Sequence, residues 1–68
     1  MHVIKSQRIY FPANDEHVIV NLLPNGRYEA YREDDVDDEG RVEFTGDGNT
    51  VLSAIASLNE ELEANDAG

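Results

Sequence analysis

An acidic block in the middle of the chain constrains its fold more than any other feature. The segment from Glu33 to Glu39 reads Glu-Asp-Asp-Val-Asp-Asp-Glu, so six of its seven residues are carboxylates. A run of like charges repels itself and gains nothing from burial, so this segment has to lie in solvent or face a positively charged surface. The block therefore belongs on the surface, and a partner that contacts it has to be positively charged there.

The length of the chain, 68 residues, predicts one small domain. Such a domain buries only about 60% of its unfolded surface, so its stability is marginal. The chain has no Cys, which excludes disulfides and thiolate metal sites and favours a reducing, cytoplasmic setting. The first residues contain no long apolar run, so we expect neither a signal peptide nor a membrane span.

The charge is unevenly distributed along the chain. Residues 1–28 carry three basic and two acidic side chains, a net charge of +1, whereas residues 29–68 carry two arginines against thirteen acids, a net charge of −11. Phosphates would be repelled by the second part, so we expect no direct nucleic-acid partner, and an anionic membrane surface is disfavoured for the same reason.

Four short strands are expected before the helix, at residues 2–11, 17–23, 27–32 and 41–45. Val18, Val20 and Leu22 alternate on one face of the second strand, and Pro24-Asn25-Gly26 is a strong hairpin turn. The polar middle of the first strand predicts a bulge or an edge position there. In the fourth strand, we expect Val42 and Phe44 to point inward.

A single helix is expected from Val51 to Glu63 or Ala64, after a Gly46-Asp47-Gly48 loop and a cap at Asn49 or Thr50. Its apolar residues share one face: Val51, Ile55, Leu58 and Leu62. Residues 1–64 would then form one domain and 65–68 a frayed tail. The predicted fold class is α+β, a small antiparallel sheet of three to four strands with one C-terminal helix packed on one face (ββββα).

Metal binding is weakly indicated. The acidic block matches four positions of a calcium-binding EF-hand loop, but Gly46 stands where the bidentate Glu is required. A zinc site would need more than His2 and His17, because neither a Cys nor a third ligand accompanies them. We therefore expect no metal and no other cofactor.

Catalysis is not predicted either. Asp47 between Gly46 and Gly48 would repel a phosphate, so these glycines are interpreted as turn residues before the helix. Ser53 and Ser57 lie far along the sequence from either His, and no base and nucleophile form a catalytic constellation. The tyrosines Tyr10, Tyr28 and Tyr31 are expected to pack on the sheet. If Tyr28 and Tyr31 emerge on opposite faces, one of them lies exposed beside the acids.

Two stretches carry a family resemblance. Residues 26–31, Gly-Arg-Tyr-Glu-Ala-Tyr, resemble the second strand of HicB-like antitoxin domains, and residues 46–55 are similar to that family's Gly-x-Thr-x-x-x-Ala approach to its helix. The Pro-Asp-Leu-Pro-Gly-like segment that precedes the helix in that family is replaced here by residues 41–45, and no C-terminal DNA-binding segment follows. The resemblance implies a ββ(β)α domain that neutralises a small basic RNA-cleaving toxin and has no catalytic role.

The charge pattern supports a first function hypothesis, an acidic inhibitor of a basic, nucleic-acid-handling protein. In an extended segment, residues repeat about every 3.3 Å, close to the roughly 3.4 Å spacing of phosphates along one DNA strand. Small phage-encoded DNA mimics that block restriction or CRISPR complexes are similar in size and charge. The predicted partner-binding residues are the acids of the block, with the helix-end acids secondary: Glu33, Asp34, Asp35, Asp37, Asp38, Glu39, Glu60, Glu61 and Glu63.

Two other hypotheses remain open. The first is the HicB-like antitoxin, whose partner would be a single small basic toxin. The second is an acidic adaptor of a halophile, in which the acids serve solubility in salt, although the slightly basic residues 1–28 do not fit a charge spread over the whole chain. The strand at residues 2–11 also offers an exposed edge that could pair two copies into a homodimer. Reversing Asp34, Asp35, Asp37 and Asp38 to Lys is expected to leave the fold intact and abolish partner binding.

Overall fold

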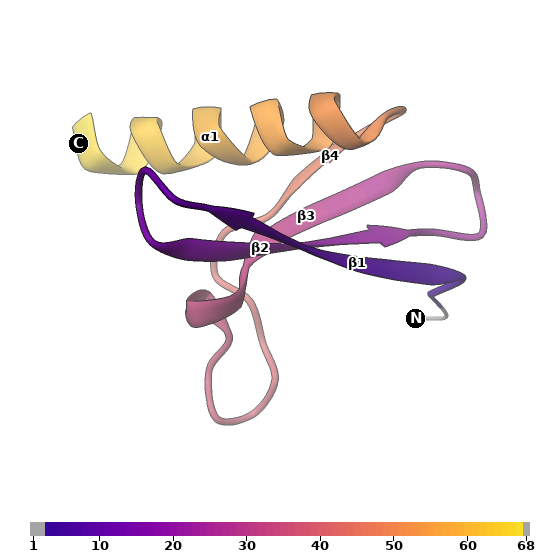
Figure 1. Cartoon of the computed structure of the whole chain (residues 1–68), viewed down its shortest axis with the longest axis horizontal. Helices are drawn as coiled ribbons and strands as arrows, with labels where there is room; N and C mark the ends of the chain where they lie inside the picture. The colour runs from indigo at the N-terminus through magenta and orange to yellow at the C-terminus, as the bar shows by residue number, and fades with distance from the viewer. Residues whose placement is uncertain (1–2, 68) are drawn as a thin grey trace.

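The computed structural model describes residues 3–67 as a four-stranded antiparallel sheet with one helix on one side (Figure 1). The strands follow one another in the order β1-β2-β3-β4. Their bounds, and those of the two helical elements, are Lys5–Phe11 for β1, Glu16–Leu22 for β2, Tyr28–Arg32 for β3, Gly46–Gly48 for β4, Glu33–Asp35 for the single 3-10 turn η1 and Val51–Ala67 for α1. The predicted α+β class and the C-terminal position of the helix are confirmed.

Two tight turns set the register of the first three strands, one between β1 and β2 and one between β2 and β3. At the predicted Pro24-Asn25-Gly26 hairpin, the backbone N–H of Leu23 donates to the carbonyl oxygen of Arg27 at 2.9 Å, and Gly26 adopts a φ of 84°. A φ of that sign is one that glycine takes without strain. β1 pairs with β2 over its whole length without interruption. Of the two alternatives for the first strand, the edge position is therefore confirmed and the bulge is wrong.

The fourth strand was predicted at residues 41–45, and this prediction is wrong. Val42 forms only an isolated bridge with Val36, whereas the ladder with β3 is made by Gly46, Asp47 and Gly48. The physical reason lies in the helix, which passes directly over β4. A Cβ atom on Gly46 would lie 2.5 Å from the carbonyl oxygen of Ala54 and closer still to the backbone nitrogen of Leu58. Only glycine fits at that position beneath the helix. This explains why β4 has the glycine-rich sequence Gly46-Asp47-Gly48, which on its own is typical of a loop.

The core lies between the helix and the middle of the sheet. It consists of Val18, Val20, Ala30, Ala54 and Leu58, all of which are at most 3% exposed. Partly buried apolar side chains surround it, among them the predicted inward residue Phe44. Because Gly46 and Gly48 have no side chain on the face of β4 that meets α1, the helix approaches that half of the sheet closely.

The boundaries of the other elements differ slightly from the predictions. The first strand begins at Lys5, and His2 lies outside the described residues. The helix was expected to end near Glu63 or Ala64, but it continues to Ala67. Residues 65–67 are therefore part of α1, and Gly68, the last residue of the predicted frayed tail, lies outside the described residues. Helix ends are among the least precise boundaries that a sequence predicts.

The helix begins with a reciprocal cap, which confirms Thr50 as the capping residue. The Thr50 Oγ1 atom accepts a hydrogen bond from the backbone N–H of Ser53 at 3.1 Å, and the Ser53 Oγ atom accepts one from the backbone N–H of Thr50 at 3.0 Å. Two backbone donors of the first turn are thus satisfied. Asn49, the alternative capping residue, instead accepts a hydrogen bond from Arg27.

Replacing Thr50 with Ala is expected to lower the free energy of unfolding by about 1 kcal/mol, the usual cost of losing a capping hydroxyl. Urea unfolding followed by circular dichroism measures the change. Thr50→Ser keeps the hydroxyl, so it should retain most of the stability. If Thr50→Ala and Thr50→Ser lose equal stability, the hydroxyl does not cap the helix.

Candidate protein-binding surface

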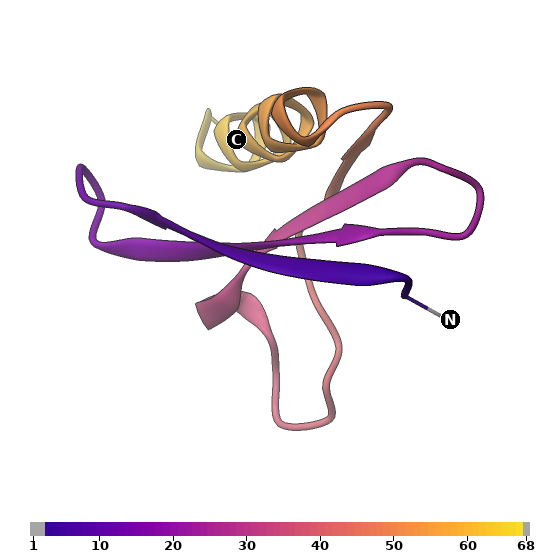
Figure 2. The same cartoon turned by 45° about the vertical axis from the view of Figure 1, so that its right-hand side comes forward.

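The predicted acidic site lies in the long connection between β3 and β4. We call residues 33–45 the acidic loop. Figures 1 and 2 show it projecting from the sheet on the side opposite to α1. The loop begins with η1, which packs against β2, and then reverses direction at a tight turn before reaching β4. Its position outside the two layers explains how seven carboxylates are tolerated in so small a fold.

The first part of the acidic loop is neither extended nor free of cations. Glu33, Asp34 and Asp35 form the turn η1. Glu33 accepts two hydrogen bonds from the guanidinium of Arg8, at 2.7 and 2.8 Å. Asp35 accepts two from Arg32, at 2.7 and 3.0 Å. The expectation of an extended track with phosphate spacing is therefore wrong for this segment, because two arginines draw the chain into a turn.

The tip of the acidic loop is organised by Asp37. Its Oδ1 atom accepts hydrogen bonds from the backbone N–H groups of Glu39 and Arg41, at 2.9 and 2.8 Å. The backbone N–H of Asp37 donates to the carbonyl oxygen of Arg41 at 2.9 Å, and Gly40 takes a φ of 82°. The bridge between Val36 and Val42 closes the base of this turn. The tip is thus a preformed hairpin built by an Asx-type turn.

The six acids of the block therefore divide into two kinds. Glu33 and Asp35 are held by Arg8 and Arg32, and the exposed Arg41 lies 3.4 Å from Asp37 and 2.8 Å from Glu39. The carboxylates of the second kind are exposed and make neither a hydrogen bond nor an ion pair with any side chain that the structure describes. They are Asp34 and Asp38, together with Glu43 further along the loop, which sequence reasoning considered only as an extension of the acidic block.

The three carboxylates at the end of the helix lie elsewhere. Glu60, Glu61 and Glu63 are exposed on α1, and both views place α1 and the acidic loop on opposite sides of the sheet (Figures 1 and 2). The structure thus does not bring the two predicted groups of acids together on one face. The helix-end acids, predicted as the secondary partner-binding residues, are therefore separated from the acidic block by the sheet.

All four arginines take part in internal ion pairs. In addition to the pairs of the acidic loop, Arg27 lies 3.1 Å from Asp47, and Arg32 lies 3.9 Å from Glu16. Exposed pairs of this kind contribute little to stability. These pairs matter for recognition. Because the guanidinium groups are already paired with carboxylates of the same chain, the surface that remains for a partner is dominated by carboxylates.

Arg8 lowers the pKa of the Glu33 carboxyl below its usual value, mainly through its hydrogen bonds. A carboxylate with a lower pKa in the folded state than in the unfolded state stabilises the fold above its ordinary pKa, and this contribution is lost as the pH falls through the folded pKa. We therefore expect Glu33→Gln to lower the free energy of unfolding at pH 7. The difference in free energy of unfolding between this variant and the unchanged protein should shrink below about pH 4.3.

Urea unfolding at a series of pH values tests this prediction. In an Arg8→Gln background, Glu33→Gln should show no such pH dependence, because the hydrogen-bond donor has been removed. A pH dependence that persists without Arg8 would assign the effect to another group.

The tyrosines are distributed over both faces of the sheet. Tyr28 packs against the core, and Tyr31 follows at an odd spacing on the opposite face. Both Tyr28 and Tyr31 are partly buried, so neither is the fully exposed tyrosine that such an arrangement was expected to place beside the acids. Tyr10 is 48% exposed, stacks on His17 with a ring-centroid distance of 4.9 Å and donates a hydrogen bond to Asp15 at 2.9 Å. That bond raises the pKa of the Tyr10 phenol.

Comparison with known proteins assigns no family: no family model, no curated protein and no solved structure matches this chain. Among residues 3–67, no three His, Asp or Glu side chains are grouped in a way that could hold a metal ion. No helix in that part of the chain is long and apolar enough to cross a membrane. What the geometry defines is a two-layer α+β domain that presents a preformed acidic hairpin.

Proposed function

We propose that this protein is a small acidic binding module that inhibits a basic, nucleic-acid-handling protein by occupying its nucleic-acid groove. One observation carries the proposal. The acidic loop projects from the fold, is held in shape by its own hydrogen bonds and exposes Asp34, Asp38 and Glu43 without an internal cation. Anti-restriction and anti-CRISPR inhibitors that act as DNA mimics are the functional class to which such a protein would belong.

Preorganisation of the loop is the physical support for this function. A segment that already has its bound shape loses less conformational entropy when it binds, so more of the electrostatic attraction appears as affinity. With a net charge of −10 for the whole chain, attraction to a basic groove also accelerates association, and added salt weakens it. Because η1 is a turn, its carboxylates do not repeat at the spacing of DNA phosphates. The proposed mimicry therefore depends on the negative charge and on the rigid hairpin.

The HicB-like antitoxin is a second candidate. It rests on the resemblance of residues 26–31 and 46–55, which lie on β3 and on β4 with the start of α1. The first stretch resembles the second strand of that family but belongs to the third strand here. Both candidates predict a basic partner. They differ in its identity, because an antitoxin would retain one small ribonuclease in a tight complex, whereas a DNA mimic would retain a larger protein that binds duplex DNA.

The test uses two variants that each remove three carboxylate charges. The loop variant is Asp34→Asn/Asp38→Asn/Glu43→Gln, which leaves every internal ion pair in place. The matched control is Glu60→Gln/Glu61→Gln/Glu63→Gln on the helix. Tagged protein is used to capture partners from a lysate of the source organism at low and at high salt, and each captured protein is purified and tested for binding to a fluorescent DNA duplex or RNA.

The unchanged protein and the helix control should capture the same basic protein at low salt, release it at high salt and displace its nucleic acid. The loop variant should bind it at least tenfold more weakly. Equal binding by the loop variant would overturn the proposal. If no protein is retained and the domain unfolds when salt is removed, the halophile hypothesis takes its place.

A further inference from the structure

β1 is an open edge of the sheet. We call this strand together with the two residues before it, 3–11, the edge segment. All seven residues of β1 pair with β2, and among residues 3–67 no other element packs extensively on it. β1 contains no Pro and its ladder is uninterrupted, so it lacks two devices that commonly block such an edge. The opposite edge strand, β4, is only three residues long. β1 is therefore the edge on which a further strand can pair.

The hydrogen bonds of β2 determine which backbone groups of β1 point outward. The backbone N–H of Leu23 donates to the carbonyl oxygen of Arg27 at 2.9 Å. Because bonded and non-bonded pairs alternate along an antiparallel ladder, the odd-numbered residues of β2 bond to β3 and the even-numbered ones bond to β1. The partners of the even-numbered residues are odd-numbered residues of β1. The backbone N–H and C=O groups of Ser6, Arg8 and Tyr10 therefore point away from the sheet.

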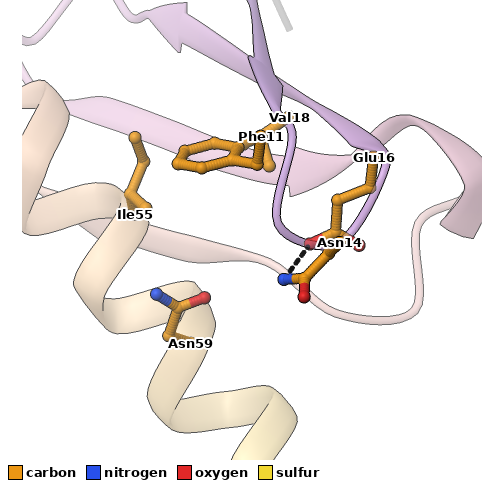
Figure 3. Close-up of a pocket in the computed structure, with 6 residues that line it drawn as sticks. All are labelled: Phe11, Asn14, Glu16, Val18, Ile55 and Asn59. Atoms are coloured by element: carbon orange, nitrogen blue, oxygen red, sulfur yellow. Dashed lines mark hydrogen bonds between the residues drawn. The ribbon is translucent and has the colours of Figure 1, made fainter.

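Exposed apolar side chains lie at both ends of the edge segment. Val3 and Ile4 at one end are 36% and 58% exposed, and Tyr10 at the other end is 48% exposed. Phe11, next to Tyr10, is only partly buried and faces Ile55 of α1 across a hollow of about 80 Å³ (Figure 3). Apolar side chains that the chain itself leaves uncovered at an open edge favour a protein partner there.

The order of residues along the edge segment selects a second copy of this chain as the partner. It reads Val-Ile-Lys-Ser-Gln-Arg-Ile-Tyr-Phe, with two apolar residues at each end and Gln7 at its centre. When two copies pair antiparallel about Gln7, the apolar end of each copy meets the apolar end of the other. The same register places Lys5 opposite Ile9 and Ser6 opposite Arg8, so no two cations are directly opposed. The edge segment is thus complementary to itself, as a two-fold interface requires.

Two neighbouring registers are less favourable. Pairing about Arg8 would place its guanidinium opposite that of the other copy, and like charges directly opposite each other destabilise a sheet. Pairing about Ile9 would place Val3 and Ile4 opposite the turn that follows Phe11, where β1 has ended.

The charge of the edge segment also favours a second copy over the basic partner proposed above. Its only charged residues are Lys5 and Arg8, which give it a charge of +2 in a chain of net charge −10. A basic protein would be repelled at this edge. Two copies approach each other there with less repulsion than through their acidic surfaces.

We infer that the protein forms a homodimer in which the edge segments of two copies pair antiparallel about Gln7. The two four-stranded sheets then become one continuous sheet. A two-fold axis between antiparallel neighbours in a sheet is perpendicular to that sheet, so the same face of both copies points the same way. The acidic loop and α1 lie on opposite sides of the sheet (Figures 1 and 2), so the dimer presents both acidic loops on one face. The dimer does not depend on the proposed function, although two loops would strengthen the binding of one basic partner.

Sedimentation velocity over a range of protein concentrations, at low and at high salt, tests the dimer. We expect a reversible equilibrium whose dissociation constant falls as salt screens the repulsion between two copies of net charge −10. Salt should instead weaken binding of the basic partner, so the two results are distinguishable. Circular dichroism at each salt concentration establishes that the domain is folded. A folded protein that stays monomeric up to millimolar concentration at high salt would overturn the inference and leave the proposed function standing.

Ile4→Lys should raise the dissociation constant of the dimer at least tenfold, because it replaces an apolar residue at both ends of the interface. Ile4 precedes β1 and is exposed, so the variant should fold. Leu52→Lys is the matched control, since it makes the same change of charge at an exposed apolar residue of α1, and it should leave the dimer intact. A dimer that Leu52→Lys dissociates and Ile4→Lys does not would overturn the inference, because the interface would then lie on the helix.

A single cysteine tests the register. In pairing about Gln7, the two copies of this residue form a non-hydrogen-bonded pair with Cα atoms about 4.5 Å apart, a distance that a disulfide spans. The chain has no Cys of its own. With oxidised glutathione as the oxidant, Gln7→Cys should form a cross-linked dimer at least tenfold faster than Leu52→Cys. Equal rates for these two variants, or faster cross-linking of Ile9→Cys, would overturn the pairing about Gln7.

Discussion

Replacing Gly46 with Ala is expected to destabilise the domain more than any other single methyl addition in the chain. The new Cβ atom would lie 2.5 Å from the carbonyl oxygen of Ala54 and closer still to the backbone nitrogen of Leu58. Both are backbone atoms of α1, so no side-chain rotation can relieve the clash. The helix would have to move away from β4, which would open the core around Ala54 and Leu58.

Overpacking of this kind costs about 1–3 kcal/mol or more. A domain of this size has about 3–10 kcal/mol in total, at roughly 0.05–0.15 kcal/mol per residue. We therefore expect Gly46→Ala to lose much of its cooperative unfolding transition in urea. The matched control is Asp47→Ala on the same strand, which removes only an exposed pair with Arg27 and should cost at most about 1 kcal/mol.

A second control separates crowding from backbone strain. Gly40 has a φ of 82° and no atom within 4 Å of its position for a Cβ, so Gly40→Ala should cost about 1–2 kcal/mol through conformation alone. A Gly46→Ala variant no less stable than Asp47→Ala would show that α1 does not rest on β4 as the structure has it.

The glycines of β4 also show how far the sequence could predict this fold. Alternation in Val18, Val20 and Leu22, the Asn25-Gly26 turn and the helical spacing of Val51, Ile55 and Leu58 are local signals, and the elements they predict are present. The identity of β4 is not a local property. Gly46 and Gly48 pair with β3 because a helix that begins after them folds back over them, so only the tertiary arrangement distinguishes this strand from a loop.

The candidate site shows the same limit. The sequence places six carboxylates together, and their exposure follows from charge alone. Which of them are engaged depends on cations from distant or neighbouring strands. Arg8 reaches Glu33 from the far edge of the sheet, across 25 positions of sequence, and no sequence pattern signals that pair. Arg32 and Asp35 are three residues apart, so their pair would have been visible if a turn had been predicted there.

Because some carboxylates of the block are held by arginines and others are not, the expected outcome of reversing their charge depends on the position. Asp35→Lys/Asp37→Lys is expected to destabilise the domain by about 3 kcal/mol, because hydrogen bonds to charged groups contribute about 1.5–3 kcal/mol each. Asp35 is only 17% exposed and would be replaced by a second cation beside Arg32. Asp37 would no longer accept the two backbone N–H groups that form the tip of the acidic loop.

Asp34→Lys/Asp38→Lys makes the same change in net charge at the two exposed positions of the block that have no partner among residues 3–67. Its stability should equal or exceed that of the unchanged protein, because repulsion within the block decreases. Urea unfolding of both double variants at low and high salt measures the contrast. Reversal of all four aspartates, which sequence reasoning expected to leave the fold intact, should therefore behave like the Asp35 and Asp37 pair.

The two double variants also separate folding from recognition. Asp34→Lys/Asp38→Lys should remain folded and lose binding of the basic partner, whereas any loss of binding by Asp35→Lys/Asp37→Lys would be confounded by its instability. Equal stability of the two variants would mean that the hydrogen bonds of Asp35 and Asp37 do not hold the acidic loop. In that case the preorganisation on which the proposed inhibitor depends would be absent, and the loop would present its charges as a flexible segment.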